Sequence, residues 1–206
     1  MSRPYYQDDY VTLYNGDCRD IMTEIDGTVD LVVTDPPYGL KKANGSHKGG
    51  YDGFGRKIKR NPKQYDGSWD NERPSGKTLN MLIDKAFQSI IWGGNYFSDL
   101  LPRSTRWLVW DKQQTMPTFS DCELAWINLK GSATKRIIYA SNGMISGEKK
   151  RMHPTQKPLA VIKWCISQAP RDIKIILDPF AGSGTTGVAA KELNKKCIMI
   201  EKEEKY

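Results

Sequence analysis

The stretch Leu31–Gly39, Leu-Val-Val-Thr-Asp-Pro-Pro-Tyr-Gly, constrains the fold more than any other part of the chain. The run Val29–Thr34 is short, rich in β-branched residues and bounded by breakers, which is typical of a buried strand in a parallel sheet. Pro36 and Pro37 end the strand because proline has no N–H to donate to a ladder. Ligands of open α/β sheets bind at this carboxyl edge. The stretch therefore predicts a rigid polar turn at a ligand-binding edge.

A second motif lies near the end of the chain. A predicted strand, Ile173–Leu177, is followed by Asp178-Pro179-Phe180-Ala181-Gly182-Ser183-Gly184-Thr185-Thr186-Gly187, a predicted helix at 185–193 and a predicted strand, Lys196–Ile200, that ends at Glu201. The pattern G-x-G-x-x-G lies between strand and helix, and an acid follows at about the spacing of a residue that holds ribose hydroxyls. Glycines admit a ligand closely, and a helix N-terminus attracts an anion. The alternative is a tight turn that binds nothing.

Asp178 favours one class of cofactor over another. A carboxylate directly before the glycines would repel a pyrophosphate, whereas it suits a ligand that carries an ammonium and a sulfonium. S-adenosylmethionine is such a ligand. A nicotinamide-dependent oxidoreductase remains the alternative, although it leaves Asp-Pro-Pro-Tyr unexplained.

The turn after the first strand suits chemistry on an exocyclic amine. The amine lone pair is conjugated into its base, and acceptors on its hydrogens free that pair for attack on a methyl group. The carboxylate of Asp35 and the prolyl carbonyl of Pro36 provide two such acceptors, and Tyr38 offers a stacking face for a flipped base. The alternative is a structural Asp-Pro turn that merely ends a strand.

The remaining pattern predicts alternating helices and strands. We expect strands at Val11–Tyr14, 89–92, 106–110, 122–129 and 136–139, with the last two as a hairpin at one edge. Helices are expected at 19–25, over the apolar period from Leu79 to Ile90 with Ser75 near the N-cap, and after Pro158 to about Ala169.

Charge and composition indicate the partner. The net charge is +7, and residues 39–77 hold ten Lys and Arg against four acids, a basic flexible loop interleaved with aromatic residues that suits DNA. A solvated loop is the alternative.

Four widely spaced cysteines predict buried, reduced thiols, and the two histidines do not favour a histidine metal site. No apolar run has membrane-spanning length, so we expect no membrane association and a cytoplasmic protein.

Together the motifs resemble the permuted β group of DNA amino-methyltransferases, bacterial and phage enzymes of the N6-adenine and N4-cytosine type that include those of restriction-modification systems. The order Asp-Pro-Pro-Tyr, His153-Pro-Thr-Gln-Lys-Pro, then the glycine loop carries the resemblance, which extends from Tyr14 to Tyr206. It implies one methyltransferase domain, 1–206, with an α/β, Rossmann-like, circularly permuted fold whose mixed sheet has seven strands, one of them a reversed edge strand. In this permuted arrangement the N-terminal strand Val11–Tyr14 would lie next to the last strand, so that Glu201 and Asp17 would border the same crevice.

The resemblance also implies the site. Its catalytic residues would be Asp35, Pro36, Pro37 and Tyr38. Its S-adenosylmethionine-binding residues would be Asp17, Cys18, Thr155, Lys157, Asp178, Pro179, Phe180, Gly182, Ser183, Gly184, Thr185 and Glu201, with Thr155 and Lys157 near the methionine carboxylate and Glu201 on the ribose.

Substrate and assembly follow from the same resemblance. The substrate would be double-stranded DNA, and Asp before Pro-Pro favours adenine N6, with cytosine N4 as the alternative. Residues 129–152 would form a reduced target-recognition region. RNA or protein methylation and a non-catalytic DNA-binding module are further alternatives, and homodimerisation is left open.

Overall fold

The computed structural model describes residues 2–40, 50–51, 57–58, 70–114, 120–140 and 156–204. The chain divides into two compact units: Met1–Pro36 together with Pro74–Tyr206, and Pro37–Arg73. The second unit contains an antiparallel pair of two-residue strands, β4 (Gly50–Tyr51) and β5 (Lys57–Ile58). The predicted loop 39–77 falls mostly on this unit, and much of it lies outside the described residues.

The first unit is built on one mixed sheet with the strand order β1-β2-β11-β10-β3-β6-β8-β7-β9. Its strands are β1 (Tyr6–Gln7), β2 (Val11–Asn15), β3 (Val29–Thr34), β6 (Ala86–Trp92), β7 (Trp107–Asp111), β8 (Cys122–Ile127), β9 (Lys135–Ile138), β10 (Ile175–Asp178) and β11 (Lys196–Glu201). Strands β2, β11, β10, β3 and β6 are mutually parallel, and β8 runs against its neighbours β6 and β7.

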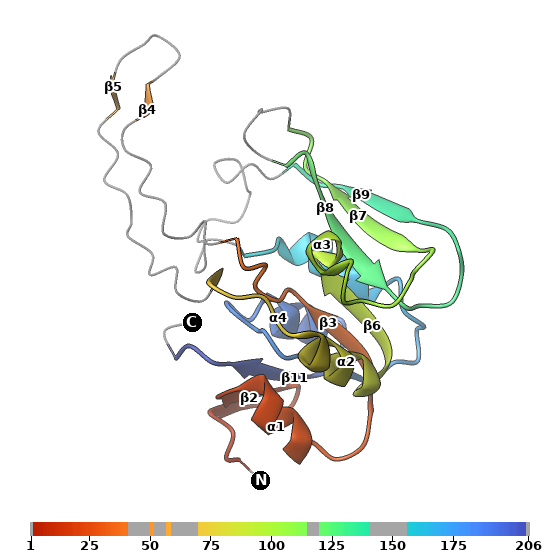
Figure 1. The fold of residues 1–206 in the computed structure, drawn as a ribbon. Coiled ribbons are helices and arrows are strands. Elements are labelled where there is room, and N and C mark those ends of the chain that lie inside the picture. The colour runs from red at the N-terminus through yellow and green to blue at the C-terminus, as the bar shows by residue number, and fades with distance from the viewer. Residues whose placement is uncertain are drawn as a thin grey trace. The chain divides into compact units, whose positions relative to one another are not determined.

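Helices cover both faces of this sheet (Figure 1). They are α1 (Cys18–Glu24), α2 (Gly76–Asp84), α3 (Leu159–Ile166) and α4 (Thr185–Glu192), with a 3₁₀ turn, η3 (Gly94–Phe97). Helices α3 and α4 share a core with Leu31, Val33 and Ile90. Val32, which lies between Leu31 and Val33 in β3, is buried on the opposite face of the sheet. Burial on both faces explains why β3 reads as a continuous apolar run.

The permuted order of the motifs is visible in the sheet. Strand β2, from the start of the chain, lies parallel to β11, from its end, with Leu13 opposite Met199 and Asn15 opposite Glu201. The expected neighbourhood of the N-terminal strand and the last strand is therefore confirmed. Two chain segments separated by nearly the whole sequence complete one continuous binding edge.

Four expectations about elements need correction. The sheet has nine strands rather than seven, because the short strands β1 and β9 extend it, and the reversed strand β8 lies between β6 and β7 rather than at an edge. Strands β8 and β9 do not form a hairpin. Because β8 is already paired with β6 on one side and β7 on the other, β9 pairs with β7 instead, in parallel.

The fourth correction concerns the helix expected to run from Leu79 to Ile90. It ends at Asp84, and β6 begins at Ala86, so that Phe87 is a strand residue with 72% of its surface exposed. The backbone N–H of Val29, the first residue of β3, donates to the carbonyl of Lys85, so that the end of the helix is tied to β3. Ser75 caps α2 as expected, accepting from the N–H of Thr78.

The cysteine expectation holds for three of four residues. Cys18, Cys165 and Cys197 are buried free thiols, whereas Cys122 is exposed at the start of β8. Among the described residues, no helix is long and apolar enough to cross a membrane.

Candidate active site

The predicted motifs meet at one edge of the first unit. Strands β3, β10, β11 and β2 are neighbours and parallel, so that their carboxyl ends lie side by side. Asp35 follows β3, the glycine loop follows β10, Glu201 ends β11, and Asp17 lies two residues beyond β2. A sheet edge of this kind is where α/β proteins bind ligands.

A buried hydrogen bond joins the two main motifs. The hydroxyl of Thr34, the residue before Asp35, donates to Oδ1 of Asp178 at 2.7 Å, across 144 residues of sequence. Asp178 also accepts from the N–H of Phe180 at 3.2 Å. Burial raises the pKa of Asp178 to about 6, although hydrogen bonds from Thr186, Thr34 and Phe180 oppose this shift. The charged form of this carboxyl is therefore costly, and a cationic ligand beside it would offset that cost.

The glycine loop leaves open space beside its backbone. Gly182 and Gly184 adopt φ values of 50° and 76°, the left-handed region that favours glycine. A Cβ built on Gly182 would meet nothing within 4 Å. Helix α4 begins at Thr185, so that its N-terminal N–H groups follow the loop directly. Within the loop, Pro179 is buried, and the hydroxyls of Ser183 and Thr185 lie 3.3 Å apart.

Glu201 is fixed to this loop and to the N-terminal segment. Its Oε2 accepts from the N–H of Gly182 at 2.6 Å, and its Oε1 accepts from the N–H of Glu203 at 2.8 Å. Its backbone carbonyl accepts from the N–H of Gly16 at 2.9 Å. A carboxylate has about four acceptor positions, so that these bonds leave capacity for ligand hydroxyls.

Asp17 and Cys18 form the start of α1. Asp17 caps the helix by accepting from the N–H of Arg19 at 3.0 Å, and it pairs with the Arg19 side chain at 2.6 Å. The side-chain hydrogen bond from Arg19 holds the pKa of Asp17 well below its usual range. Burial raises the pKa of the Cys18 thiol to about 11. Both residues therefore have structural roles in the described state, beside Glu201 on the neighbouring strand.

Lys157 contacts the Asp-Pro-Pro-Tyr motif. Its Nζ lies 2.5 Å from Oδ2 of Asp35 and 3.0 Å from Oε2 of Glu123, and only 7% of its side chain is exposed. The resemblance implied a place near the methionine carboxylate, and this role of Lys157 stays a prediction. Thr155, its expected companion, lies outside the described residues.

Sequence reasoning missed Glu123, Lys112 and Thr34. Lys112 pairs with Glu123 at 2.5 Å, which adds a second cation to the same cluster. The signal for Glu123 was a lone charge in the apolar strand Cys-Glu-Leu-Ala-Trp-Ile, but its partners depend on the strand order, which sequence pattern did not predict.

The rest of the Asp-Pro-Pro-Tyr turn bridges the unit boundary. Pro36 is buried in the first unit, and Pro37 and Tyr38 begin the second. Within the second unit, the N–H groups of Tyr38 and Gly39 both donate to Oδ1 of Asp70, at 2.8 and 3.0 Å. Asp70 is 6% exposed, so that the turn is anchored by a buried carboxylate.

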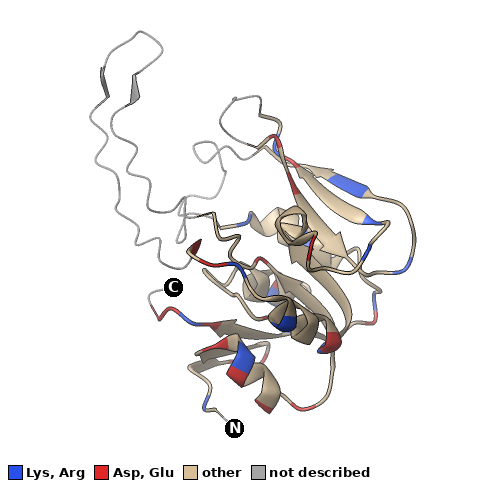
Figure 2. Cartoon of the chain, viewed as in Figure 1, with Lys and Arg blue, Asp and Glu red and all other residues tan. Residues whose placement is uncertain are grey.

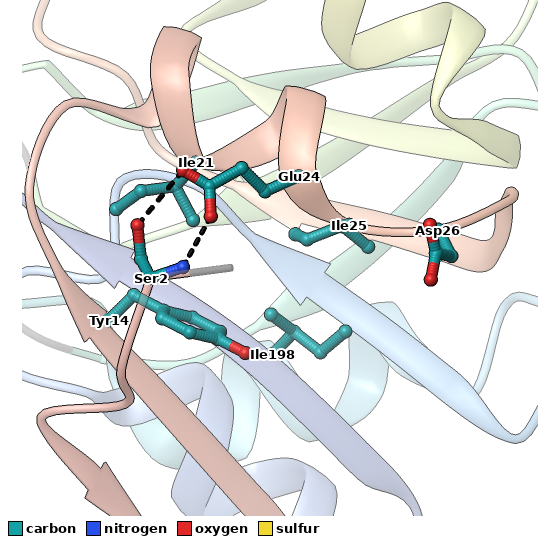
Figure 3. Close-up of a pocket in the computed structure, with 7 residues that line it drawn as sticks. All are labelled: Ser2, Tyr14, Ile21, Glu24, Ile25, Asp26 and Ile198. Carbon is teal, nitrogen blue, oxygen red and sulfur yellow. Dashed lines mark hydrogen bonds between the residues drawn. The ribbon is translucent and has the colours of Figure 1, made fainter.

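The described residues also form a separate pocket between α1 and the strands β2 and β11 (Figure 3). Its volume is about 160 Å³, and it is lined by Ser2, Tyr14, Ile21, Glu24, Ile25, Asp26 and Ile198. Glu24 closes one side by accepting from the backbone N–H and the hydroxyl of Ser2. None of the predicted site residues lines this pocket. Among the described residues, no group of three or more His, Cys, Asp or Glu is placed to hold a metal ion.

Known structures share this fold. The chain aligns with M1.HpyAVI in complex with SAM at 24% identity and a TM-score of 0.57, over 95% of both chains. It aligns with the cytosine-N4-specific PvuII DNA methyltransferase at 15% identity and a TM-score of 0.62, over 98% of this chain and 85% of that one. At these identities the likeness establishes the fold, which confirms the predicted class.

Sequence comparison establishes the family. The chain is 28% identical to the type II methyltransferase M2.MboI of Moraxella bovis, over 98% of this chain and 87% of that protein. The family model described as DNA methylase, of the N6/N4 type, matches residues 104–206, which is half of the chain and includes β10, the glycine loop and β11. The chain therefore belongs to the DNA methylase family of N6/N4 amino-methyltransferases.

Proposed function

We propose that this protein transfers a methyl group from S-adenosylmethionine to the exocyclic N6 of a flipped adenine in double-stranded DNA. The observation that carries the proposal is the hydrogen bond between Thr34 and Asp178. It holds the start of the Asp-Pro-Pro-Tyr motif against the start of the glycine loop. A methyl donor at one motif would thus be adjacent to an acceptor at the other, as direct transfer requires.

The residues present fit S-adenosylmethionine. The open backbone at Gly182 and the left-handed turn at Gly184 suit close approach of a ligand, and Asp178 suits its cationic methionyl part. Glu201 would accept from the ribose hydroxyls, with Asp17 and Cys18 near the adenine ring. Pro179, Phe180, Ser183 and Thr185 would complete the wall of the site, and Thr155 and Lys157 would lie toward the methionine carboxylate. When bound, S-adenosylmethionine supplies a methyl group activated by its sulfonium.

Asp35 and Pro36 would prepare the acceptor. The carboxylate of Asp35 and the carbonyl of Pro36 each accept one hydrogen of the amine, and this draws the nitrogen lone pair out of conjugation. As the nitrogen forms its bond to the methyl carbon, the bond between that carbon and the donor's sulfur would break and leave its electron pair on sulfur. Asp35 would receive the proton that the amine loses and return it to solvent. Pro37 would keep the turn rigid, and Tyr38 would stack on the flipped base.

DNA contact is assigned to basic segments. Residues 39–77 carry an excess of six positive charges in sequence, which suits the phosphate backbone. In the first unit, the exposed residues Lys130, Lys135 and Arg136 lie in or just before β9 (Figure 2). We assign these to the reduced target-recognition region, 129–152, within a single methyltransferase domain that works in the cytoplasm of a bacterial cell or phage-infected host.

One assay tests the whole proposal. Purified protein is incubated with unmethylated genomic DNA and tritiated S-adenosylmethionine, and the nucleosides are then separated by mass spectrometry. We expect N6-methyladenine; N4-methylcytosine would establish the alternative base, and no label in DNA would refute the proposal. Light scattering on the same sample distinguishes monomer from homodimer.

Two controls assign the residues and the cofactor. Asp35→Ala should abolish transfer while calorimetry still shows S-adenosylmethionine binding, because Asp35 contacts the acceptor rather than the donor. Full activity in this variant would remove Asp35 from the mechanism. Tight binding of NAD without binding of S-adenosylmethionine would favour the oxidoreductase alternative instead.

A further inference from the structure

Four charged side chains form a continuous chain of ion pairs beside the candidate active site. Lys112 Nζ lies 2.5 Å from Glu123 Oε1, Glu123 Oε2 lies 3.0 Å from Lys157 Nζ, and Lys157 Nζ lies 2.5 Å from Asp35 Oδ2. Two of these residues are acids and two are bases, so that the cluster is neutral overall. Lys157 therefore divides its positive charge between a catalytic carboxylate and a second carboxylate that no proposed step uses.

The cluster is sheltered from solvent. The exposed fraction of the side chain is 7% for Lys157, 16% for Lys112 and about a quarter for both Asp35 and Glu123. The Lys157 ammonium lies 5.4 Å from the centre of the Trp92 ring, and Lys112 lies 5.0 Å from that of Trp110. Apolar walls reduce screening, so that each charge acts strongly on its neighbours.

Glu123 is the rigid member of this cluster. It lies in β8, opposite Trp110 of β7, and the N–H of Lys112 donates to the carbonyl of Asp121 across the same strand pair. Burial would raise the pKa of Glu123, but Lys157 and Lys112 outweigh it and hold the pKa at about 2. A carboxylate that stays ionised on a strand gives Lys157 a fixed anchor.

We propose that Glu123 is a positioning residue of the methyl-transfer reaction, which anchors Lys157 and thereby fixes the orientation of the Asp35 carboxylate. This inference rests on the proposed function. Glu123 shares the charge of Lys157 with Asp35, at 3.0 and 2.5 Å, and this limits how strongly Lys157 occupies the Asp35 carboxylate, which must also accept an amine hydrogen. Lys157 in turn holds one oxygen of Asp35 in place.

The proposal predicts opposite pH shifts for two variants. Glu123→Gln leaves more of the Lys157 charge on Asp35, so that protonation of Asp35 requires a lower pH. Lys157→Gln removes the cation and leaves Asp35 beside Glu123 and Asp178, so that protonation occurs at a higher pH. A purely structural role would give no such opposition, because loss of packing does not depend on the sign of the removed charge.

The experiment measures single-turnover methyl transfer to unmethylated genomic DNA between pH 3.5 and 9. We expect Glu123→Gln to lower the rate at pH 7.5 by about ten-fold, less than the ~10²-fold that a 1 Å misplacement can cost. The acid limb of its pH–rate profile, where the rate falls as the pH decreases, should move down by about half a pH unit. The acid limb of Lys157→Gln should move up by a similar amount. The KM for DNA should change by less than about two-fold, because neither residue is proposed to bind DNA.

Two further variants serve as controls. Glu123→Asp should recover most of the rate, since it restores the anchor charge. Glu192→Gln removes the same charge from the Glu192–Lys163 pair, which is half-exposed and spans α4 and α3 at 2.8 Å, and should leave the acid limb unchanged. The charge of Asp35 raises the pKa of Asp178, at the end of β10. Because Asp178 is present in every variant, its contribution to the acid limb does not affect the comparison.

The possible results are distinguishable. Coincident limbs for wild type, Glu123→Gln and Lys157→Gln would overturn the inference while leaving the proposed function intact, as would shifts in the same direction. If Glu123→Gln does not fold, an unchanged limb in Lys157→Gln is sufficient to overturn it. A wild-type protein that transfers no methyl group to DNA would instead refute the proposed function itself.

Discussion

Asp178 illustrates a conflict between stability and binding at the scale of one residue. It is 4% exposed, and burial raises its pKa from 3.8 to about 6. Below pH 4 both folded and unfolded chains hold the proton, so that the shift costs nothing. Between about pH 4 and 6 the unfolded chain ionises first, and stability falls as the pH rises. Above pH 6 the folded chain bears the full cost of a buried charge.

We therefore predict that Asp178→Asn stabilises the free protein at pH 7.5. The gain is at most about 3 kcal/mol, since one pKa unit corresponds to about 1.4 kcal/mol. Asn keeps an oxygen that can accept from Thr34 and Phe180, but it cannot attract an ammonium. Urea unfolding should show the gain, and calorimetry should show S-adenosylmethionine affinity reduced by about ten-fold or more.

The exposed Asp172→Asn provides the matched control, with no expected change in either measurement. A less stable Asp178→Asn protein, or one that binds S-adenosylmethionine normally, would contradict the prediction. Asp178 could be singled out from its sequence context, because an acid between a strand and a glycine loop is unusual for a phosphate site. The roles of Thr34 and Glu123 could not, because both depend on partners from distant segments of the chain.

At the scale of elements, η3 depends on one glycine. A Cβ at Gly94 would lie 2.5 Å from Trp126 Cβ and 2.8 Å from Trp126 N, on the reversed strand β8. Neither atom can move without moving the strand. We predict that Gly94→Ala destabilises the protein by about 1–3 kcal/mol, the usual cost of overpacking. The midpoint of urea unfolding measures the effect.

Gly76→Ala is the control for this substitution. Gly76 begins α2, and a Cβ there would lie at an ordinary 3.5 Å from Leu100. The same change should therefore stabilise the protein by up to about 1 kcal/mol, because alanine favours the helix more than glycine does. Equal effects of the two substitutions would show that the contact with β8 does not determine the packing of η3.

Element boundaries show where sequence pattern is sufficient. Strand β3 matches its prediction at both ends, because a β-branched run between breakers has one interpretation. Helix α2 does not, since the apolar residues of α2 and β6 happen to continue one helical period across Lys85. The boundary is set by the pairing of β6 with β3, a tertiary contact that local periodicity does not contain.

At the scale of the whole molecule, the order of motifs predicted more than any local pattern. The resemblance placed the N-terminal strand beside the C-terminal one, and β2 pairs with β11 as expected. The position of β8 between β6 and β7 was missed, because a strand that inserts between two others leaves no periodic signal. That position brings Glu123 to the cluster around Lys157, so that the missed topology and the missed residue have one cause.

The distribution of charge over the whole chain leads to a last prediction. Reversal of Lys57, Lys59 and Arg60 to Glu should weaken DNA binding and reduce the slope of log affinity against log salt concentration. Three lost phosphate contacts correspond to a change in slope of about 3, since each contributes about 0.9.

The matched control reverses Arg171, Lys174 and Lys196, exposed residues at the amino ends of β10 and β11, opposite the candidate site. Its slope should equal that of wild type, because counterion release depends on where the charges meet the DNA and not on net charge. Titration of a labelled duplex from 50 to 200 mM salt separates these results, and equal slopes for both triple variants would mean that residues 39–77 do not contact the phosphate backbone.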